Sequence, residues 1–244
     1  MTREFAVMSE PKINKQDIEN ALEKMQETFK KEETRIKTVI ETELDPFITK
    51  IYEMGAESER FRVFKEAYQY FNSKYQNKRH LFASILDAAS EISVEKIKDQ
   101  LHLLFVYLGT IESIANTVVD MLVMLLVVNG RDLHIECKGF RTPRIRHVVS
   151  IKEDLEKERI ALGMKISFLR ENGIKEFTSI IDTKLRNRIA HLDFEIKDDN
   201  VLIKGKPAVI DAIFGLKKLL VAISTTTGML YDAATERGII PKEK

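Results

Sequence analysis

A long apolar segment, residues 101–128, constrains the fold of this chain more than any other feature of its sequence. Ser93 before it and Asn129-Gly130 after it are suited to cap a helix, so we expect one helix over residues 94–128. A helix of about 35 residues would be roughly 50 Å long. Its apolar residues surround most of the cylinder, which predicts the central helix of a hydrophobic core.

Three polar residues interrupt this segment: Glu112, Asn116 and Asp120. They recur every four residues and therefore share one face of the helix. Because carboxylates in the middle of a membrane are expensive, we expect a buried helix of a soluble bundle rather than a membrane span. Two interpretations of the polar face stay open: it is exposed to solvent, or it faces a functional site or an interface.

Composition excludes several classes of protein. The chain has 244 residues, of which 44% are hydrophobic, so it can build a core, and its net charge of +1 excludes nucleic-acid binding through bulk charge alone. Cys137 is the single cysteine, which excludes an internal disulfide and a thiolate zinc cluster and favours a reducing compartment. The first residues lack the apolar core of a signal peptide, so we expect a cytoplasmic protein.

The rest of the chain predicts an all-α fold: a bundle of about five helices over residues 93–240, preceded by an N-terminal helical region over residues 1–92. In that region we expect a helix that ends at Asp45-Pro46, a helix over 57–75 and a solvated basic turn over 74–80. The first of these helices has two open interpretations: it packs on its own domain, or it is an arm that pairs with another subunit.

Further helices are expected over residues 150–172, over 174–190 and from Pro207 onward. Alternation predicts a short extended piece at 133–137 and a minor β-hairpin formed by 194–196 and 201–203.

Most enzyme signatures are missing from the sequence. It contains no glycine-rich phosphate loop, no HExxH motif and no paired cysteines. Its 5 histidines form no pair at metal-ligand spacing on a helix. We therefore expect neither a metal site nor a cofactor.

One short segment combines residue types suited to phosphate chemistry: Arg186-Asn187-x-x-x-His191. On a helix, Asn187 and His191 share a face, so the amide could orient the imidazole. Arg186 lies roughly 140° around the helix from His191, so it must reach round the helix, or the helix must end near the motif. In a chain of this composition, an Arg-Asn pair at this distance from a histidine is expected by chance about 0.01 times.

This segment resembles the Arg-Asn-x-x-x-His motif of the HEPN superfamily, the higher eukaryote and prokaryote nucleotide-binding domains. The resemblance covers roughly residues 93–237, and Ile189-Ala190 supplies the apolar and small residues that usually precede the histidine. Members of the superfamily are all-α bundles of four or five helices, with the motif late in the domain. Their motif faces its copy in a second subunit, so the resemblance implies a homodimer with a shared groove.

What the resemblance implies for function is metal-independent cleavage of RNA, in which the substrate 2′-hydroxyl attacks the adjacent phosphate. His191 would act as general base or acid, Arg186 would stabilise the charge on the phosphate, and Asn187 would orient the histidine or the phosphate. Candidate residues around this catalytic set fall into two groups. Those that would contact the RNA are Arg188 and the basic loop residues Arg141, Arg144 and Arg146, and those that would support Arg186 are Glu112, Asn116 and Asp120.

Two alternatives stand beside the ribonuclease. Many members of the superfamily are thought to be non-catalytic modules that bind nucleic acid, a nucleotide or a partner protein. The motif residues could also be structural, because side chains near a helix end can cap the helix or pair with Asp193. Family members often act in toxin–antitoxin or antiviral systems, so the resemblance also implies a toxin or defence role with a cognate antitoxin or another protein as partner.

Overall fold

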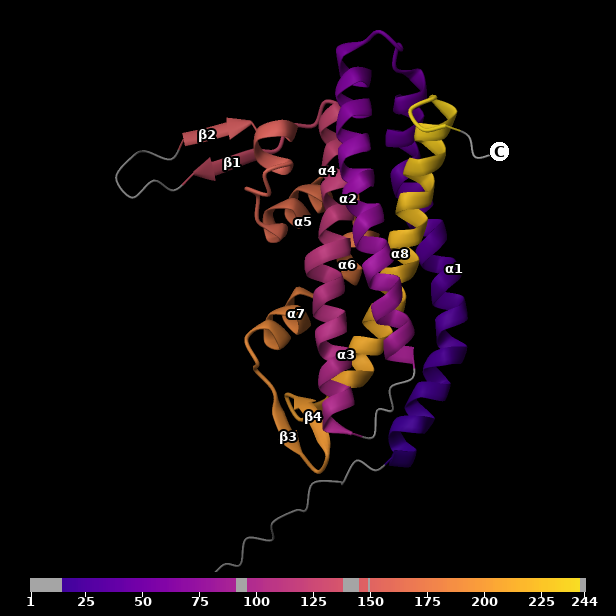
Figure 1. Cartoon of the computed structure of the whole chain (residues 1–244), viewed down its shortest axis with the longest axis vertical. Helices are drawn as coiled ribbons and strands as arrows, with labels where there is room; N and C mark the ends of the chain where they lie inside the picture. Colours follow the sequence, from indigo (N-terminus) through magenta and orange to yellow (C-terminus); the bar gives the residue numbers. More distant parts are fainter. Residues whose placement is uncertain (1–14, 91–95, 138–144, 149, 242–244) are drawn as a thin grey trace, which may run out of the picture.

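In the computed structural model, residues 15–90, 96–137, 145–148 and 150–241 are described. Long helices run side by side along the molecule (Figure 1). They are α1 (Lys15–Glu53), α2 (Glu59–Ser90), α8 (Ala208–Glu236) and a continuous helix made of α3 (Ile97–Thr110), the π turn η1 (Ile111–Ala115) and α4 (Asn116–Val128). Three shorter helices pack against these long ones: α5 (Leu162–Glu171) on α4, α6 (Glu176–Ile180) on α8 and α1, and α7 (Thr183–Ala190) on α3. The predicted all-α bundle is confirmed.

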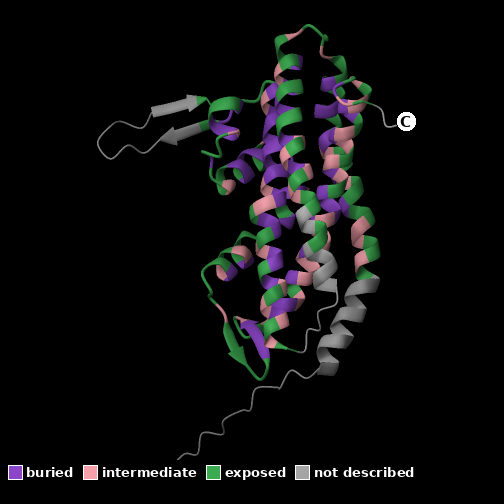
Figure 2. Cartoon of the chain, viewed as in Figure 1, coloured by how far each residue is buried: buried purple, intermediate pink, exposed green. Residues whose placement is uncertain are grey.

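The continuous helix over Ile97–Val128 forms the centre of the core, as its composition predicts. Every residue from Leu122 to Leu126 is fully buried, and buried positions gather on the faces that the long helices turn toward one another (Figure 2). This helix is long and apolar enough to cross a membrane, but 78% of its most apolar window is buried inside the protein, which the core helix of a soluble bundle also shows. It ends at Asn129-Gly130 as expected, with Gly130 in a left-handed conformation, while the expected cap at Ser93 lies outside the described residues.

The N-terminal helix α1 packs along α8, and its buried Ile36, Ile40 and Leu44 belong to the same core as the central helix. The prediction that a helix ends at Asp45-Pro46 is wrong, because α1 continues through Pro46 to Glu53. Proline removes one backbone hydrogen bond from a helix. Burial of Phe47 and Ile48 directly after it offsets that loss.

Three other sequence-based boundaries are wrong. The basic turn expected over 74–80 is part of α2, because Lys74 and Lys78 find partners on neighbouring elements while Tyr75 is buried between them. The helix expected over 150–172 is divided into η2 (Ile151–Leu155) and α5, with Glu158 between them at a left-handed φ of 54°. The helix expected over 174–190 is divided into α6 and α7 at Asp182.

The strands form two small antiparallel sheets. The extended piece predicted at 133–137 is confirmed as β1 (His134–Cys137), which pairs with β2 (Ile145–Val148) in a hairpin that projects from the bundle (Figure 1). The hairpin predicted at 194–203 is confirmed as β3 (Glu195–Lys197) and β4 (Asn200–Ile203), and β5 (Lys206–Pro207) extends it. Asp198 and Asp199 form its turn at positive φ, as two-residue hairpin turns of the primed type require.

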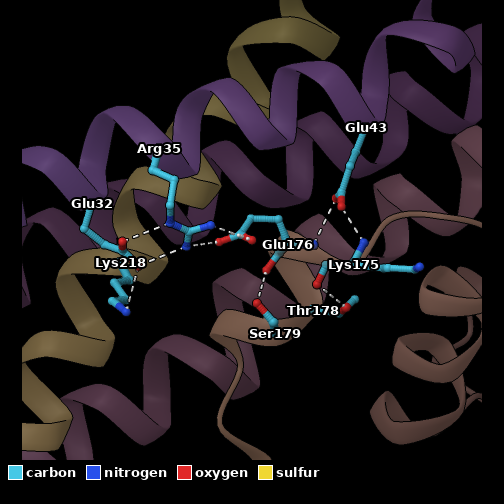
Figure 3. A network of polar contacts seen from close by, with 8 residues as sticks. All are labelled: Glu32, Arg35, Glu43, Lys175, Glu176, Thr178, Ser179 and Lys218. Carbon is cyan, nitrogen blue, oxygen red and sulfur yellow. Dashed lines mark hydrogen bonds and ion pairs between the residues drawn. The ribbon is translucent and has the colours of Figure 1, made fainter.

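A network of ion pairs fastens α6 to α1 and α8 (Figure 3). The guanidinium of Arg35 on α1 contacts the carboxylates of Glu32 at 2.9 Å and Glu176 at 2.7 Å, and Lys218 of α8 contacts Glu32 at 3.0 Å. Arg35, joined by Lys218, lowers the pKa of Glu32 to about 2. Glu43 accepts the backbone N–H of Glu176 at the start of α6, so α1 holds both the side chain and the backbone of this short helix.

Candidate functional site

The motif Arg186-Asn187-x-x-x-His191 lies on α7 and at its C-terminal end. Asp182 caps the start of the helix, its Oδ1 accepting the backbone N–H groups of Lys184 and Leu185 at 2.9 Å each. Leu185 and Ile189 are buried and anchor α7 against the bundle. With one face fixed in this way, the motif side chains lie on the remaining surface of the helix.

The helix ends at the motif, which was one of the two geometries that the sequence allowed. His191 is the C-terminal cap, and its backbone N–H donates to the carbonyl of Asn187 at 3.0 Å. Leu192 follows at a left-handed φ of 55°, so the chain turns away immediately after the histidine. The imidazole of His191 is therefore on an exposed helix end, and among the described residues no hydrogen-bond partner holds its ring.

Arg186 is held from two sides. Its Nε and one terminal nitrogen contact the carboxylate of Glu112, which lies in the π turn η1 of the central helix. Its other terminal nitrogen donates to Oδ1 of Asn187 at 2.7 Å. The side chain keeps 31% of its surface exposed, so the guanidinium is oriented but still accessible to a ligand.

Asn187 therefore orients the arginine and not, as the helical spacing suggested, the imidazole of His191. An i, i+4 pair on a helix meets only when both residues are inside the helix, and His191 is already its cap. The amide oxygen turns toward the guanidinium because a charged donor makes the stronger hydrogen bond.

The polar row Glu112, Asn116 and Asp120 does not act as one unit. Only Glu112 reaches Arg186. The Nζ of Lys165, a residue of α5, contacts Asp120 at 2.6 Å and Asn116 at 3.0 Å. Lys165 and Asp120 are each 1% exposed, so this part of the row is an internal ion pair of the core. Burial raises the pKa of Asp120, and the ammonium of Lys165 opposes that effect.

The π turn that carries Glu112 has its own partner on α2. A π turn leaves backbone groups outside the regular helical ladder, and such turns are frequent at functional sites. Here the carbonyl of Ser113 accepts from Nζ of Lys78 at 3.1 Å and from the hydroxyl of Thr117 at 2.9 Å. Lys78 also donates to that hydroxyl at 2.9 Å. These contacts with α2 fix the backbone of the turn that carries Glu112.

The remaining basic candidates lie in two places. Arg188 donates to the carboxylate of Asp193 at 2.9 Å, the structural pairing that was considered for the motif. Arg146 lies on β2, but its side chain is outside the described residues, as are Arg141 and Arg144 altogether. Within the described residues, no group of three or more His, Cys, Asp or Glu side chains is arranged to hold a metal ion.

Two residues of this region, Lys165 and Lys78, were not predicted from the sequence. Lys165 follows Leu162 by three residues and precedes Leu169 by four, so it falls on the apolar face of α5, and a lysine on such a face needs a buried partner. That signal was available in the sequence. Lys78 had no such signal, because the π turn that it binds is visible only in three dimensions.

The sequence matches no protein-family model, and comparisons with curated proteins and with solved structures found no match.

Proposed function

We propose that this chain is a metal-independent endoribonuclease of the HEPN type, and that its site consists of Arg186, Asn187 and His191. The observation that carries the proposal is the arrangement at the end of α7. On this one short helix, the guanidinium of Arg186 is oriented by Glu112 and Asn187, and the imidazole of His191, which has no partner among the described residues, lies at the exposed C-terminal cap. This pairs a permanent cation with an imidazole, the side chain most often used in general acid–base catalysis, and both are suited to phosphate chemistry.

In the proposed reaction, His191 removes the proton from a ribose 2′-hydroxyl while that oxygen attacks the adjacent phosphorus. Arg186 stabilises the negative charge that develops on the non-bridging oxygens. The bond from phosphorus to the 5′-oxygen breaks, and an acid group returns a proton to that oxygen. The products are a 2′,3′-cyclic phosphate and a 5′-hydroxyl, so atoms and charge balance without a metal or a redox partner.

A single motif supplies one histidine, whereas the reaction needs a base and an acid. We therefore propose a two-fold homodimer in which both motifs face one groove, because symmetry doubles the set of groups. The exposed apolar side chain of Leu192, which is 60% accessible and follows His191 directly, supports an interface at this place. Light scattering should show a dimer at micromolar concentration. Mixing inactive Arg186→Ala and His191→Ala subunits should restore part of the activity, and a monomer would contradict this step.

The direct test is to incubate purified protein with total RNA in EDTA and to analyse the ends of any fragments. The proposal expects cleavage, with 2′,3′-cyclic phosphate and 5′-hydroxyl termini. Absence of cleavage, or fragments with 3′-hydroxyl and 5′-phosphate termini, would contradict it.

A second candidate is a non-catalytic module that binds RNA, a nucleotide or a partner protein. It is favoured by the fact that carboxylates already neutralise both motif arginines, Arg186 through Glu112 and Arg188 through Asp193. If the wild type cuts no RNA, and Arg186→Ala and His191→Ala weaken binding equally, this second candidate is correct. A toxin or defence role in the cytoplasm, with an antitoxin as partner, belongs to the ribonuclease proposal and depends on it.

A further inference from the structure

Two cavities lie next to each other between α2 and α8, and no residue of the Arg186 motif lines either of them. The first, the apolar cavity, has a volume of about 390 Å³, and the second, the polar cavity, a volume of about 510 Å³. They share three lining residues, Tyr75, Arg79 and Ser224, so one ligand could extend through both. Each volume is within the range of roughly 300 to 1,000 Å³ that is typical of small-molecule sites.

The walls of the two cavities differ in chemistry. The apolar cavity is lined mainly by residues of α8 and α2, with Ile114 of η1 and with Glu33 and Lys37 of α1, which pair with each other at 2.7 Å. Its apolar lining residues are Ala83, Ile114, Leu220, Val221 and Ile223. The lining of the polar cavity contains no carboxylate, and its residues other than the shared three are Asn72, Gln76, Thr227, Gly228 and Tyr231.

Arg79 lies where the two cavities meet and differs from the other arginines discussed above. Arg35 and Arg186 each contact carboxylates, whereas Arg79 makes no hydrogen bond or ion pair with any residue that the structure describes. Glu33 is the one carboxylate among the described residues that line the two cavities, and it pairs with Lys37, so the donors of Arg79 are available for an anion. The guanidinium of Arg79 therefore predicts where the negatively charged group of a ligand would bind.

Neighbouring side chains add neutral donors to this position. The hydroxyl of Thr227 donates its one proton to the carbonyl of Ile223 at 2.8 Å and lies 3.5 Å from the hydroxyl of Tyr75, which is too long for a firm hydrogen bond, so the Tyr75 proton can turn to a ligand. Oδ1 of Asn72 accepts from Nε2 of Gln76 at 3.4 Å, and within the described part of the chain no acceptor takes the amide N–H groups of Asn72. Donors of this kind, around a cation, suit the oxygens of a carboxylate or a phosphate.

We propose that the two cavities form one binding site for a small organic anion with an apolar body. Its carboxylate or phosphate contacts Arg79, Tyr75 and Asn72 in the polar cavity, and its apolar body fills the apolar cavity against Ile114 and Leu220. This site is separate from the proposed ribonuclease site, and neither its existence nor its test depends on cleavage of RNA.

The test uses two fluorescent probes with a related aromatic body, of which only one carries a charge. The full-length protein is titrated with 1-anilinonaphthalene-8-sulfonate, an anion, and with N-phenyl-1-naphthylamine, which is neutral. Loss of a charge-assisted contact should make binding of the anion to Arg79→Ala about tenfold weaker. Binding of the neutral probe should change little. Lys65→Ala is the matched control, since Lys65 is an exposed cation of α2 that lines neither cavity.

A second variant blocks the site by volume instead of charge. Gly228 lines the polar cavity, and a Cβ at this position would meet nothing within 4 Å. Gly228→Leu should therefore fold normally and weaken binding of the anionic probe. If Arg79→Ala and Lys65→Ala bind the anionic probe equally well, the proposal is wrong.

Competition separates the two ligand chemistries. Displacement of the bound sulfonate by octanoate indicates a carboxylate ligand, and displacement by 1-naphthyl phosphate indicates a phosphate ligand. Displacement by neither would overturn the proposal. Displacement by inorganic phosphate at the same concentration would also overturn it, because an apolar body would then contribute nothing.

Discussion

Glu112 and Asp120 lie on the same helix, eight residues apart, and both bind a cation from another element, but their surroundings differ. Glu112 keeps 41% of its side chain exposed and binds Arg186, which is itself 31% exposed. The side chain of Asp120 is almost fully buried and binds the equally buried side chain of Lys165. The first ion pair can exchange its partner for a ligand, whereas the second is enclosed by the core.

This difference shows why one polar row supports two roles. A charge that is removed from water needs its partner in the folded state, so the pair of Asp120 and Lys165 acts on stability. A partly exposed ion pair contributes little to stability, typically up to about 1 kcal/mol. The pair of Glu112 and Arg186 can therefore orient a functional group without being needed for the fold. Substitutions of Asp120 or Lys165 should therefore change the unfolding free energy, whereas substitutions of Glu112 should change binding at Arg186.

The largest effect on stability is expected for the buried pair of Asp120 and Lys165. Asp120→Ala leaves the ammonium of Lys165 buried with only Asn116 as a partner, and breaking a buried pair in this way costs about 3–5 kcal/mol. Urea unfolding would measure the loss. A loss below about 1 kcal/mol would show that the pair is not enclosed as described.

The control for this variant removes both charges together. Asp120→Leu combined with Lys165→Met replaces the ion pair with apolar side chains, and such replacements are often neutral or stabilising. The double variant should therefore be more stable than Asp120→Ala. Glu112→Ala at the exposed end should lose no more than about 1 kcal/mol.

The sequence predicts local features of the fold better than contacts between distant elements. The central helix, the hairpin over 194–203 and the start of α8 after Pro207 follow from composition and local pattern, and all are present. By contrast, continuation of α1 through Pro46 depends on packing against α8, which local rules do not contain.

In the candidate site, too, local features are predicted better than contacts between distant residues. The motif on α7 is readable from the sequence because its residues are adjacent. The contact of Arg186 with Glu112 joins residues that are 74 positions apart, and the sequence predicts only that the polar row as a whole supports the arginine. The structure separates Glu112 from Asn116 and Asp120, because the latter two face α5 and Lys165.

A smaller, pH-dependent effect on stability is expected at Lys78, which donates to the π turn η1. Burial, followed by the nearby ammonium of Lys74, lowers the pKa of Lys78 below its ordinary value of 10.5. The unfolded chain then binds this proton more tightly than the folded protein, so the contribution of Lys78 to stability rises with pH below 10.5. The unfolding free energy of the wild type relative to Lys78→Met should increase between about pH 8 and pH 10. A constant difference would contradict this.

The smallest effect is expected at the exposed end, for Glu112→Gln. This variant keeps the shape of the side chain but removes a carboxylate that competes with phosphate for Arg186. Binding of a short RNA should become roughly two- to fivefold tighter, with stability changed by less than about 1 kcal/mol. Fluorescence anisotropy would measure the affinity, with Glu59→Gln, an exposed glutamate of α2, as the control. Weaker binding would show that orientation of the arginine outweighs the competition.

The central claim is that the exposed end of α7 transfers protons, and His191→Ala tests it most directly. Cleavage rates of the wild type and of this variant are compared on one RNA in EDTA, together with RNA affinity and melting temperature. Because general acid–base groups typically contribute a factor of about 10² to 10⁴, the variant should cleave at least about 100-fold more slowly. Its affinity and melting temperature should remain those of the wild type. An unchanged cleavage rate, or a wild type that cuts no RNA, would contradict the account.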